Sequence, residues 1–189
     1  MESVAPYLAF SRRRLFVKYH SAAGYLHYDL RLEYLGVLLS WALPDGLSYY
    51  PNDRCKAIEV DDHRKEYGMF EGVRERDTIM LWDRGLWEPE PECGDINACL
   101  RKGELRFVLY GAKLKGSWTL TRNPWQQKNG RAIWTISKNS DPFARVQDAM
   151  SILDEAPYSV ISGKTLEEIR RTWGITRKGP RSESTLFEM

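Results

Sequence analysis

The residues best suited to chemistry lie close together near the start of the chain. Of its three histidines, His20 and His27 stand seven positions apart, and Asp29 and Arg31 follow His27 at every second position. Imidazole nitrogens and a carboxylate side by side can bind a divalent metal of the manganese, iron or zinc kind. An arginine beside them can bind a phosphate through two parallel hydrogen bonds. This pattern indicates a metal site that handles phosphate, although a single His-x-Asp on a strand is more often a hydrogen-bonded surface pair.

A strand is expected to position most of these groups. Polar and apolar residues alternate over residues 26–32, which is typical of a half-buried strand. Successive side chains of a strand point to opposite faces, so His27, Asp29 and Arg31 share one face and the apolar residues between them face the core. His20 precedes this strand beyond a loop at residues 21–24, where it can supply a third ligand.

The third histidine, His63, lies in the polar segment 60–67 that follows another expected strand. The end of a strand is a common place for functional residues. His63 is therefore a further candidate for the same site.

The rest of the chain predicts a mainly β protein. Short strands separated by turns at regular spacing are typical of an all-β barrel or sandwich. Asp95 and Gly103 are placed to begin and end a short helix, and Thr165 with Glu168 has capping-box spacing. Residues 143–153 are expected to form another helix, and residues 123–130 a polar loop between strands. The expected strands are 15–17, 26–32, 37–43, 57–60, 78–82, 105–110, 118–121 and 132–136.

Composition sets limits on the class of protein. A chain of 189 residues with 42% hydrophobic and 12% aromatic residues can bury the core of one domain, and disordered chains are poorer in aromatics. The net charge of +2 does not indicate a nucleic-acid binder, although Arg12, Arg13, Arg14 and Lys18 cluster. No apolar run approaches the ~18 residues of a membrane span, and the first residues lack the pattern of a signal peptide. We therefore expect a cytoplasmic protein without a membrane partner.

The three cysteines, Cys55, Cys93 and Cys99, are odd in number and form no Cys-x-x-Cys pair. This pattern argues against a disulfide framework or a structural zinc site. A reducing compartment fits such a chain best.

Blocks of residues along the chain resemble, in order, the motifs of one known family. The run His-Tyr-Asp-Leu-Arg-Leu-Glu at residues 27–33 and the Asp-Asp-His at residues 61–63 are the most specific of them. With these, the chain resembles the 3′-phosphoesterase domain of bacterial and archaeal DNA ligase D over most of residues 15–170. The other matching blocks are 16–20, 36–44, 67–72, 82–88, 105–109, 114–116, 134–144 and 159–169.

The resemblance implies a compact β-barrel with a crescent groove and a few short flanking helices. It implies a manganese ion held by His20, His27 and Asp29, a set that other divalent metals such as Zn²⁺ or Co²⁺ would also suit. The catalytic residues that it implies are Arg31, His63 and Tyr67. Further groups near the phosphate, counting those at neighbouring positions, are Lys18, Ser40, Arg54 and Asp61.

The resemblance also implies an activity. The family removes a 3′-terminal ribonucleoside from a strand by phosphodiester cleavage and then removes the 3′-phosphate, which prepares ends for joining in DNA repair. The expected partners are 3′ ends of DNA, with or without terminal ribonucleotides, and a separate ligase or polymerase, because those parts do not occur in this sequence. Two alternatives stay open: a 3′-end-binding module that has lost turnover, and a phosphatase for small nucleotides.

The chain departs from the family pattern at five places. Six residues separate His20 from His27, where the family usually has five. One extra residue on a strand would reverse its faces, but a loop with Gly24 can absorb it. The family has lysine, arginine and glutamine where this chain has Asp45, Cys55 and Lys18, and the glycine-rich loop is shortened to residues 74–77.

The expected organisation has four segments. An irregular entry segment covers 1–14, and the phosphoesterase barrel covers 15–150. An extension with a short helix covers 151–173, and a polar, mobile tail covers 174–189.

Overall fold

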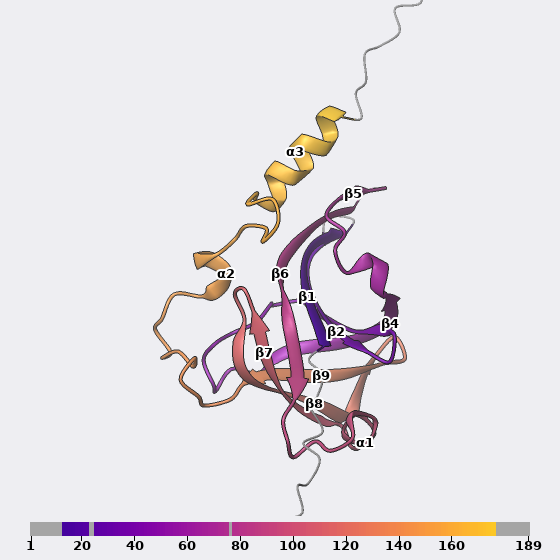
Figure 1. Ribbon diagram of the computed structural model, residues 1–189, viewed down its shortest axis with the longest axis vertical. Coiled ribbons are helices and arrows are strands. Elements are labelled where there is room, and N and C mark those ends of the chain that lie inside the picture. Colours follow the sequence, from indigo (N-terminus) through magenta and orange to yellow (C-terminus); the bar gives the residue numbers. More distant parts are fainter. Residues whose placement is uncertain (1–12, 23–24, 76, 177–189) are drawn as a thin grey trace, which may run out of the picture.

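The computed structural model describes residues 13–22, 25–75 and 77–176. Within these residues the protein is mainly β, as expected, with one antiparallel sheet and a few short helices (Figure 1). The strands are β1 (Arg13–Ala22), β2 (Tyr25–Tyr34), β3 (Val37–Leu43), β4 (Cys55–Arg64), β5 (Gly72–Arg74), β6 (Asp77–Pro89), β7 (Glu104–Gly111), β8 (Lys115–Lys128) and β9 (Arg131–Lys138). The helices are the 3₁₀ turn η1 (Lys65–Tyr67), α1 (Ile96–Lys102), α2 (Ile152–Glu155) and α3 (Leu166–Thr176).

The sheet closes into an eight-stranded barrel. Neighbouring strands follow the order β1-β2-β3-β4-β9-β8-β7-β6, and β1 pairs with β6 to complete the ring. β6 pairs with β7 along only one part of its length, whereas its pairing with β1 continues further. Along this further part, β5 pairs with the edge of β6 that is opposite β1. β5 and the adjoining ends of β1 and β6 therefore extend above the body of the barrel (Figure 1). This extension overhangs the outer face of the barrel, where the candidate site lies.

The barrel interior is filled by apolar side chains from every second position of the strands. Trp82, Trp87 and Trp118 are fully buried, and Leu30 of β2 lies in the same cluster. Burying one tryptophan removes roughly 150–250 Å² from water, which corresponds to about 4–6 kcal/mol as an upper estimate. This core fixes the inner face of β2, so the alternate residues His27, Asp29 and Arg31 must lie on the outer face.

The helix ends follow the signals in the sequence. The Asp95 side chain accepts a hydrogen bond from the backbone of Asn97 at 3.0 Å, and α1 ends at Gly103 with a positive φ of 88°. The Glu168 carboxylate accepts from the backbone of Thr165 at 2.8 Å, and the Thr165 hydroxyl accepts from Glu168 at 3.3 Å. Both predicted caps are confirmed.

Two predicted segments differ from the structure. Residues 123–128 belong to β8 and do not form a loop, and a tight turn at Asn129 and Gly130 joins β8 to β9. Both turn residues have positive φ, 53° and 75°, which is the conformation that Asn-Gly favours in a two-residue hairpin. The helix expected at 143–153 is reduced to α2, because the Arg145 backbone N–H donates to the Tyr49 carbonyl, outside any helix.

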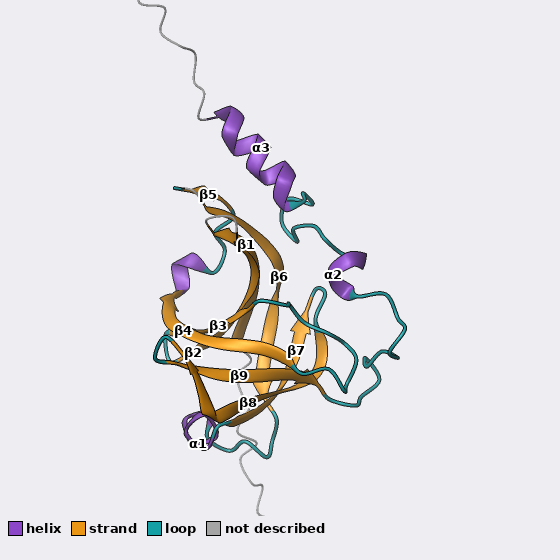
Figure 2. Ribbon diagram, turned by 180° about the vertical axis from the view of Figure 1, so that it is seen from behind, coloured by secondary structure: helices purple, strands orange, loops and turns teal. Residues whose placement is uncertain are grey.

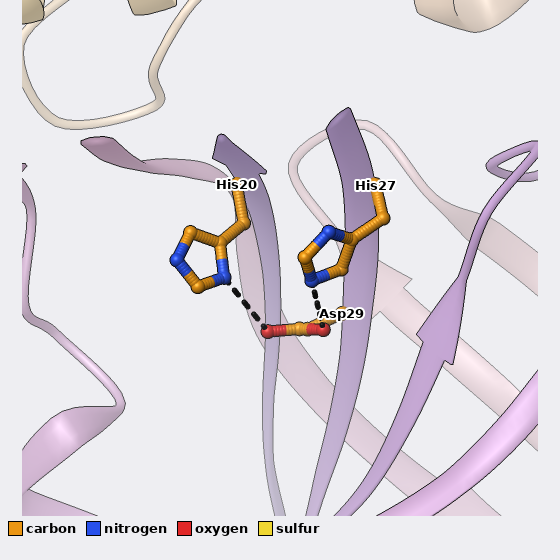
Figure 3. Close-up of side chains that lie close together, drawn as sticks. All are labelled: His20, His27 and Asp29. Carbon is orange, nitrogen blue, oxygen red and sulfur yellow. Dashed lines mark ion pairs between the residues drawn. The ribbon is translucent and has the colours of Figure 1, made fainter. Parts of the chain in front are cut away.

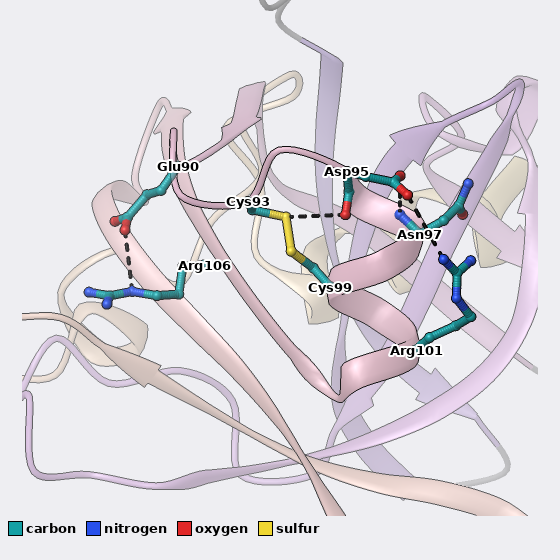
Figure 4. The surroundings of a disulfide bond; sticks show 7 residues. All are labelled: Glu90, Cys93, Asp95, Asn97, Cys99, Arg101 and Arg106. Atoms are coloured by element: carbon teal, nitrogen blue, oxygen red, sulfur yellow. Dashed lines mark hydrogen bonds and ion pairs between the residues drawn. A yellow bond between two sulfur atoms is a disulfide. The ribbon is translucent and has the colours of Figure 1, made fainter.

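The cysteine pattern also led to a wrong expectation. Cys93 and Cys99 form a disulfide that ties the segment before α1 to the helix (Figure 4). The chain folds back at this point, so the two Cα atoms lie 6.2 Å apart although the sequence gives no Cys-x-x-Cys signature. Cys55 is the free cysteine of the described residues. The cysteine argument for a reducing compartment therefore loses its basis.

The C-terminal helices lie outside the barrel. α3 contacts β5 and β6, and Figure 2 shows it beside the extension that rises above the barrel. The expected entry segment 1–14 and tail 174–189 fall mostly on residues 1–12 and 177–189, which lie outside the described residues. Among the helices that the structure describes, none is long and apolar enough to cross a membrane.

Candidate metal and phosphate site

The hairpin of β1 and β2 brings the two histidines together. His20 and His27 are direct cross-strand partners, and so are Ala22 and Tyr25. Side chains of directly opposed residues lie on the same face of a sheet. In spite of the extra residue between the histidines, both side chains therefore lie on the outer face with Asp29.

The nitrogen and oxygen atoms of the three side chains converge (Figure 3). His20 Nδ1 lies 3.9 Å from Asp29 Oδ2, and His27 Nε2 lies 3.4 Å from Asp29 Oδ1. One donor atom from each residue can be chosen so that all lie within 4.8 Å of one another. Two imidazoles and a carboxylate form a donor set that suits a divalent transition metal.

The surroundings hold His20 and Asp29 in the protonation states that a metal requires. Burial lowers the pKa of His20, although Asp29 opposes this effect. Burial acts to raise the pKa of Asp29, but the contacts with His27 and Arg31 outweigh it and hold that pKa below its usual value. At neutral pH the site therefore offers a neutral His20 and an ionised Asp29, as metal ligation demands.

Unsatisfied polar atoms gather at this site. Among the described residues, buried side-chain atoms without a hydrogen bond include His20 Nε2, His27 Nδ1 and Arg31 Nε; the fourth belongs to Trp41. Buried polar atoms are normally hydrogen-bonded, so such exceptions call for an explanation. His20 Nε2 lies 3.5 Å from Asp77 Oδ2, which places a second carboxylate behind this imidazole.

A polar pocket of about 270 Å³ borders the triad on the side of His20. Arg31 of β2 lines it and is only 6% exposed, and its NH2 group donates to Asp29 Oδ2 at 3.0 Å. The Nε of the same guanidinium is buried and has no hydrogen-bond partner. The other cationic or hydrogen-bonding residues of the pocket wall are Lys18, His63, Tyr67 and Arg74.

Ser40 sets the tautomer of His63. The Ser40 hydroxyl donates to the Leu38 carbonyl at 2.8 Å, so its oxygen accepts a hydrogen bond from His63 Nδ1–H at 3.1 Å. His63 Nε2 therefore carries the lone pair of the neutral ring. Burial, followed by the charge of Arg31, lowers the pKa of His63.

Lys18 is the most deeply buried cation of the pocket. It is 1% exposed, and its ammonium donates to the carbonyl of Phe70, which follows η1. Burial and the nearby Arg31 lower the pKa of Lys18 to about 7. Lys18 thus fastens the segment after η1, and with it Tyr67, to the outer face of β1.

Four residues singled out from the sequence lie away from this pocket. Arg54 is exposed and donates to the carbonyls of Pro51 and Asp53. Asp61 is exposed and forms a two-hydrogen-bond ion pair with Arg131. Asp45 and Cys55 line a separate pocket. The two departures from the family pattern at Asp45 and Cys55 are therefore not at the triad.

Asp77 and Arg74 were not among the residues singled out from the sequence. Both flank the shortened loop and line the pocket, Asp77 at the start of β6 and Arg74 at the end of β5. The Arg74 guanidinium lies 5.5 Å from the centre of the Tyr67 ring. Their positions in the pocket wall depend on the pairing of β5 with β6. This pairing cannot be predicted from a pattern of neighbouring residues in the sequence.

Comparison with known proteins assigns the chain to a family. Residues 18–122, more than half of the chain, match the model of the DNA ligase D 3′-phosphoesterase domain. The chain belongs to this family. The matched part begins at Lys18 of β1 and ends at Arg122 of β8, so it contains the triad, Arg31, His63 and Tyr67.

Several curated relatives are multifunctional non-homologous end joining proteins named LigD. The protein from Pseudomonas aeruginosa is 39% identical over 158 residues, which is 81% of this chain and 18% of that protein. The protein from Mycolicibacterium smegmatis is 36% identical over 173 residues, or 86% of this chain and 21% of that protein. A Mycobacterium tuberculosis relative is 35% identical over 101 residues, 51% of this chain and 13% of its own length. The chain thus spans about a fifth or less of the relatives that it matches.

Proposed function

We propose that this protein is a metal-dependent 3′-phosphoesterase that trims the 3′ ends of DNA strands during end repair. The observation that carries the proposal is the convergence of His20, His27 and Asp29 beside an arginine whose Nε has no partner. Family membership supports a phosphoesterase, and the names of the relatives support a place in non-homologous end joining. The substrate is a strand that ends in a ribonucleoside or a 3′-phosphate.

The triad would hold manganese through two imidazoles and one carboxylate, and Zn²⁺ or Co²⁺ would suit the same donors. When bound, the metal supplies positive charge that stabilises the charge developing on the phosphate in the transition state. The proton competes with the metal for His20 and His27, so activity should fall in acid.

The chain's own residues orient the phosphate. Arg31 donates to one phosphate oxygen through the nitrogen that Asp29 leaves free, and the Tyr67 hydroxyl donates to another. His63 presents Nε2, because Ser40 holds Nδ1. A bound phosphate brings negative charge that raises the pKa of His63, so this ring can share a proton with an oxygen of the phosphate and stabilise the departing group.

The binding-module alternative receives no support from the site. It was motivated by Asp45 and Cys55, and both residues lie at another pocket, away from the triad. We therefore favour the enzyme. After the 3′ end has been trimmed, a ligase or polymerase would complete the repair.

The deciding experiment uses the full chain, manganese and a primer-template that ends in a 3′-phosphate. We expect phosphate release that depends on manganese, stops with a chelator and falls steeply with salt, because phosphate contacts dominate binding. A matched substrate with a 3′-terminal ribonucleoside should yield the shortened 3′-phosphate strand first. Tight binding of the strand end without release of phosphate would favour the binding module.

A further inference from the structure

A second pocket, here called the Tyr25 pocket, borders the triad on the side of His27. The polar pocket proposed to hold the phosphate borders the triad on the side of His20. Its volume is about 230 Å³, and it lies between Tyr25 and His27 of β2 and the tip of the β8–β9 hairpin. None of the phosphate-site residues except His27 contributes to it.

The floor of this second pocket is apolar. It consists of Ala42 of β3 with Ile58 and Val60 of β4. Asp29 pairs with Ala42, and Ala42 pairs with Ile58, so the floor continues the row of side chains that begins at the triad. Outward-facing positions of a barrel strand usually carry polar residues, and this alkyl floor therefore suits a flat, weakly polar ligand.

The wall of this pocket is aromatic, and its rim is positively charged. The Tyr25 side chain is 56% exposed, and its ring is roughly parallel to that of His27, at 29° with the centroids 5.7 Å apart. Open aromatic faces of this kind stack nucleobases of any sequence. Lys128 stands at the hairpin tip and adds positive charge, which favours a phosphodiester strand over a neutral ligand.

We propose that this pocket binds the nucleobase of the nucleotide whose 3′ oxygen carries the phosphate, with Tyr25 stacked on the base. This inference rests on the proposed function, which places the phosphate beside the triad. The same base stays in the pocket while the ribonucleoside and then the phosphate are removed, because it belongs to the strand that remains. The alkyl floor presents no hydrogen-bonding group, so any base is accepted.

The test compares two oligonucleotides that end in a 3′-phosphate and differ only in the last sugar, which carries thymine or no base. Stacking on one aromatic ring is worth roughly a 5- to 150-fold difference. We expect the wild-type protein to have a KM lower by about that range for the thymine-bearing strand. Tyr25→Ala should remove most of the difference and leave the abasic strand unaffected, and Tyr25→Trp should restore it.

Leu26→Ala is the matched control. Leu26 neighbours Tyr25 and is 49% exposed, but it lines a different pocket, so its loss should change neither substrate. Trp125→Ala controls for unspecific stacking, because Trp125 is 91% exposed and lies outside the pocket. A loss with Trp125→Ala instead of Tyr25→Ala would overturn the proposal. So would a Tyr25 effect confined to substrates that carry a terminal ribonucleoside, since the base would then lie on the leaving side.

Fluorescence anisotropy with the same two strands and a chelator separates this inference from the proposed function. Base-dependent binding that Tyr25→Ala abolishes, without hydrolysis under any metal, would disprove the phosphoesterase and support the pocket. Manganese-dependent hydrolysis that is indifferent to the base and to Tyr25 would disprove the pocket and support the enzyme.

Discussion

Asp29 and Asp83 are both buried carboxylates on barrel strands, but their surroundings differ. Asp83 is fully buried and accepts three hydrogen bonds from backbone N–H groups: from Arg84 at 2.8 Å, from Lys113 at 3.0 Å and from Leu114 at 2.8 Å. Asp29 accepts one hydrogen bond, from Arg31, and lies near two histidines whose ring nitrogens include unpaired atoms.

The pKa directions follow from this difference. Burial raises the pKa of Asp83 in spite of its three hydrogen bonds, because the cationic Lys113 contributes least. At Asp29 the effect of burial is overcome by His27 and Arg31, and its pKa falls. A carboxylate whose hydrogen bonds are all made within the chain holds the fold together. A carboxylate that faces two imidazole nitrogens at 3.4 and 3.9 Å is placed to share a ligand with them.

The largest effect should come from Asp83→Ala. The substitution leaves three buried backbone N–H groups without acceptors, each worth about 1–3 kcal/mol, so the free energy of unfolding should fall by about 3–5 kcal/mol in urea titrations. Asp83→Asn keeps one acceptor oxygen and should lose about half as much, which protects the test if the alanine variant does not fold. A loss below about 1 kcal/mol for both variants would show that Asp83 is not the support described here.

Asp29→Ala should have the opposite effect to Asp83→Ala: a large loss of activity with little loss of stability. The change removes one of three ligands, and we expect the affinity for manganese and the rate of 3′-end hydrolysis to fall by at least ~100-fold, since even residues behind the ligands cost 10–100-fold. The free energy of unfolding should fall little or rise, because buried site residues are commonly unfavourable for stability. Isothermal titration with manganese and urea unfolding on the same preparation check both parts.

Arg31→Ala is the control that separates the metal from the phosphate. All three proposed ligands remain, so manganese should still bind, with an affinity lower by about 10-fold because Asp29 loses its hydrogen bond from Arg31. At saturating manganese, hydrolysis should still fall roughly 10–100-fold through the loss of a charge-assisted contact worth ~1.5–3 kcal/mol. Arg31→Lys should not restore the rate, because an ammonium cannot form the same pair of hydrogen bonds. If Arg31→Ala hydrolyses the substrate at the normal rate, the phosphate does not bind beside β2. The proposed roles of His63 and Tyr67 would then lose their support.

Much of the fold could be predicted from local patterns. The alternation around Asp29 predicted β2 and its two faces, and the caps at Asp95 and Thr165 predicted two helix starts, because each depends on residues close in sequence. The hairpin at Asn129 was missed because its polar residues were interpreted as a loop, although Asn-Gly is a strong turn signal. The Cys93–Cys99 bond was missed because pairing depends on the path of the chain and not on spacing alone.

The candidate site divides in the same way. The shared face of His27, Asp29 and Arg31 follows from strand geometry alone. His20 needed the register of the hairpin. His63 was already a candidate from its place at the end of a strand, and Tyr67 needed the resemblance to a family. Asp77 and the Tyr25 pocket could not be foreseen, because they depend on β5 and the β8–β9 hairpin approaching β1 and β2 from distant parts of the sequence.

Asp77→Asn should have a smaller effect than the loss of a ligand. The Asp77 carboxylate lies 3.5 Å from the histidine nitrogen that faces away from the triad, the usual place for the group that orients a metal-binding imidazole. We expect manganese affinity to fall by about 10-fold, without a change in urea stability, because Asp77 is partly exposed. Glu75→Gln, at another acidic residue of the same pocket, is the charge-matched control and should leave the affinity within about threefold. Equal losses for both variants would indicate a general effect of charge and no specific role for Asp77.

The smallest effect is expected at Asp61, which the resemblance places near the phosphate. In the structure its carboxylate is exposed and paired with Arg131 at 3.0 and 3.2 Å, outside the pocket that Arg31 and His63 line. An exposed ion pair contributes little, so Asp61→Ala should change manganese affinity and the rate of hydrolysis by less than about threefold. The freed Arg131 guanidinium lies at the rim of the Tyr25 pocket, so strand binding at low salt should tighten slightly and become more dependent on salt. The measurement is anisotropy of a 3′-phosphate strand across a salt series, with hydrolysis followed in parallel. If Asp61→Ala instead lowers hydrolysis more than 10-fold at unchanged strand affinity, then Asp61 acts on the reaction itself and belongs to the catalytic site together with His63 of the same strand.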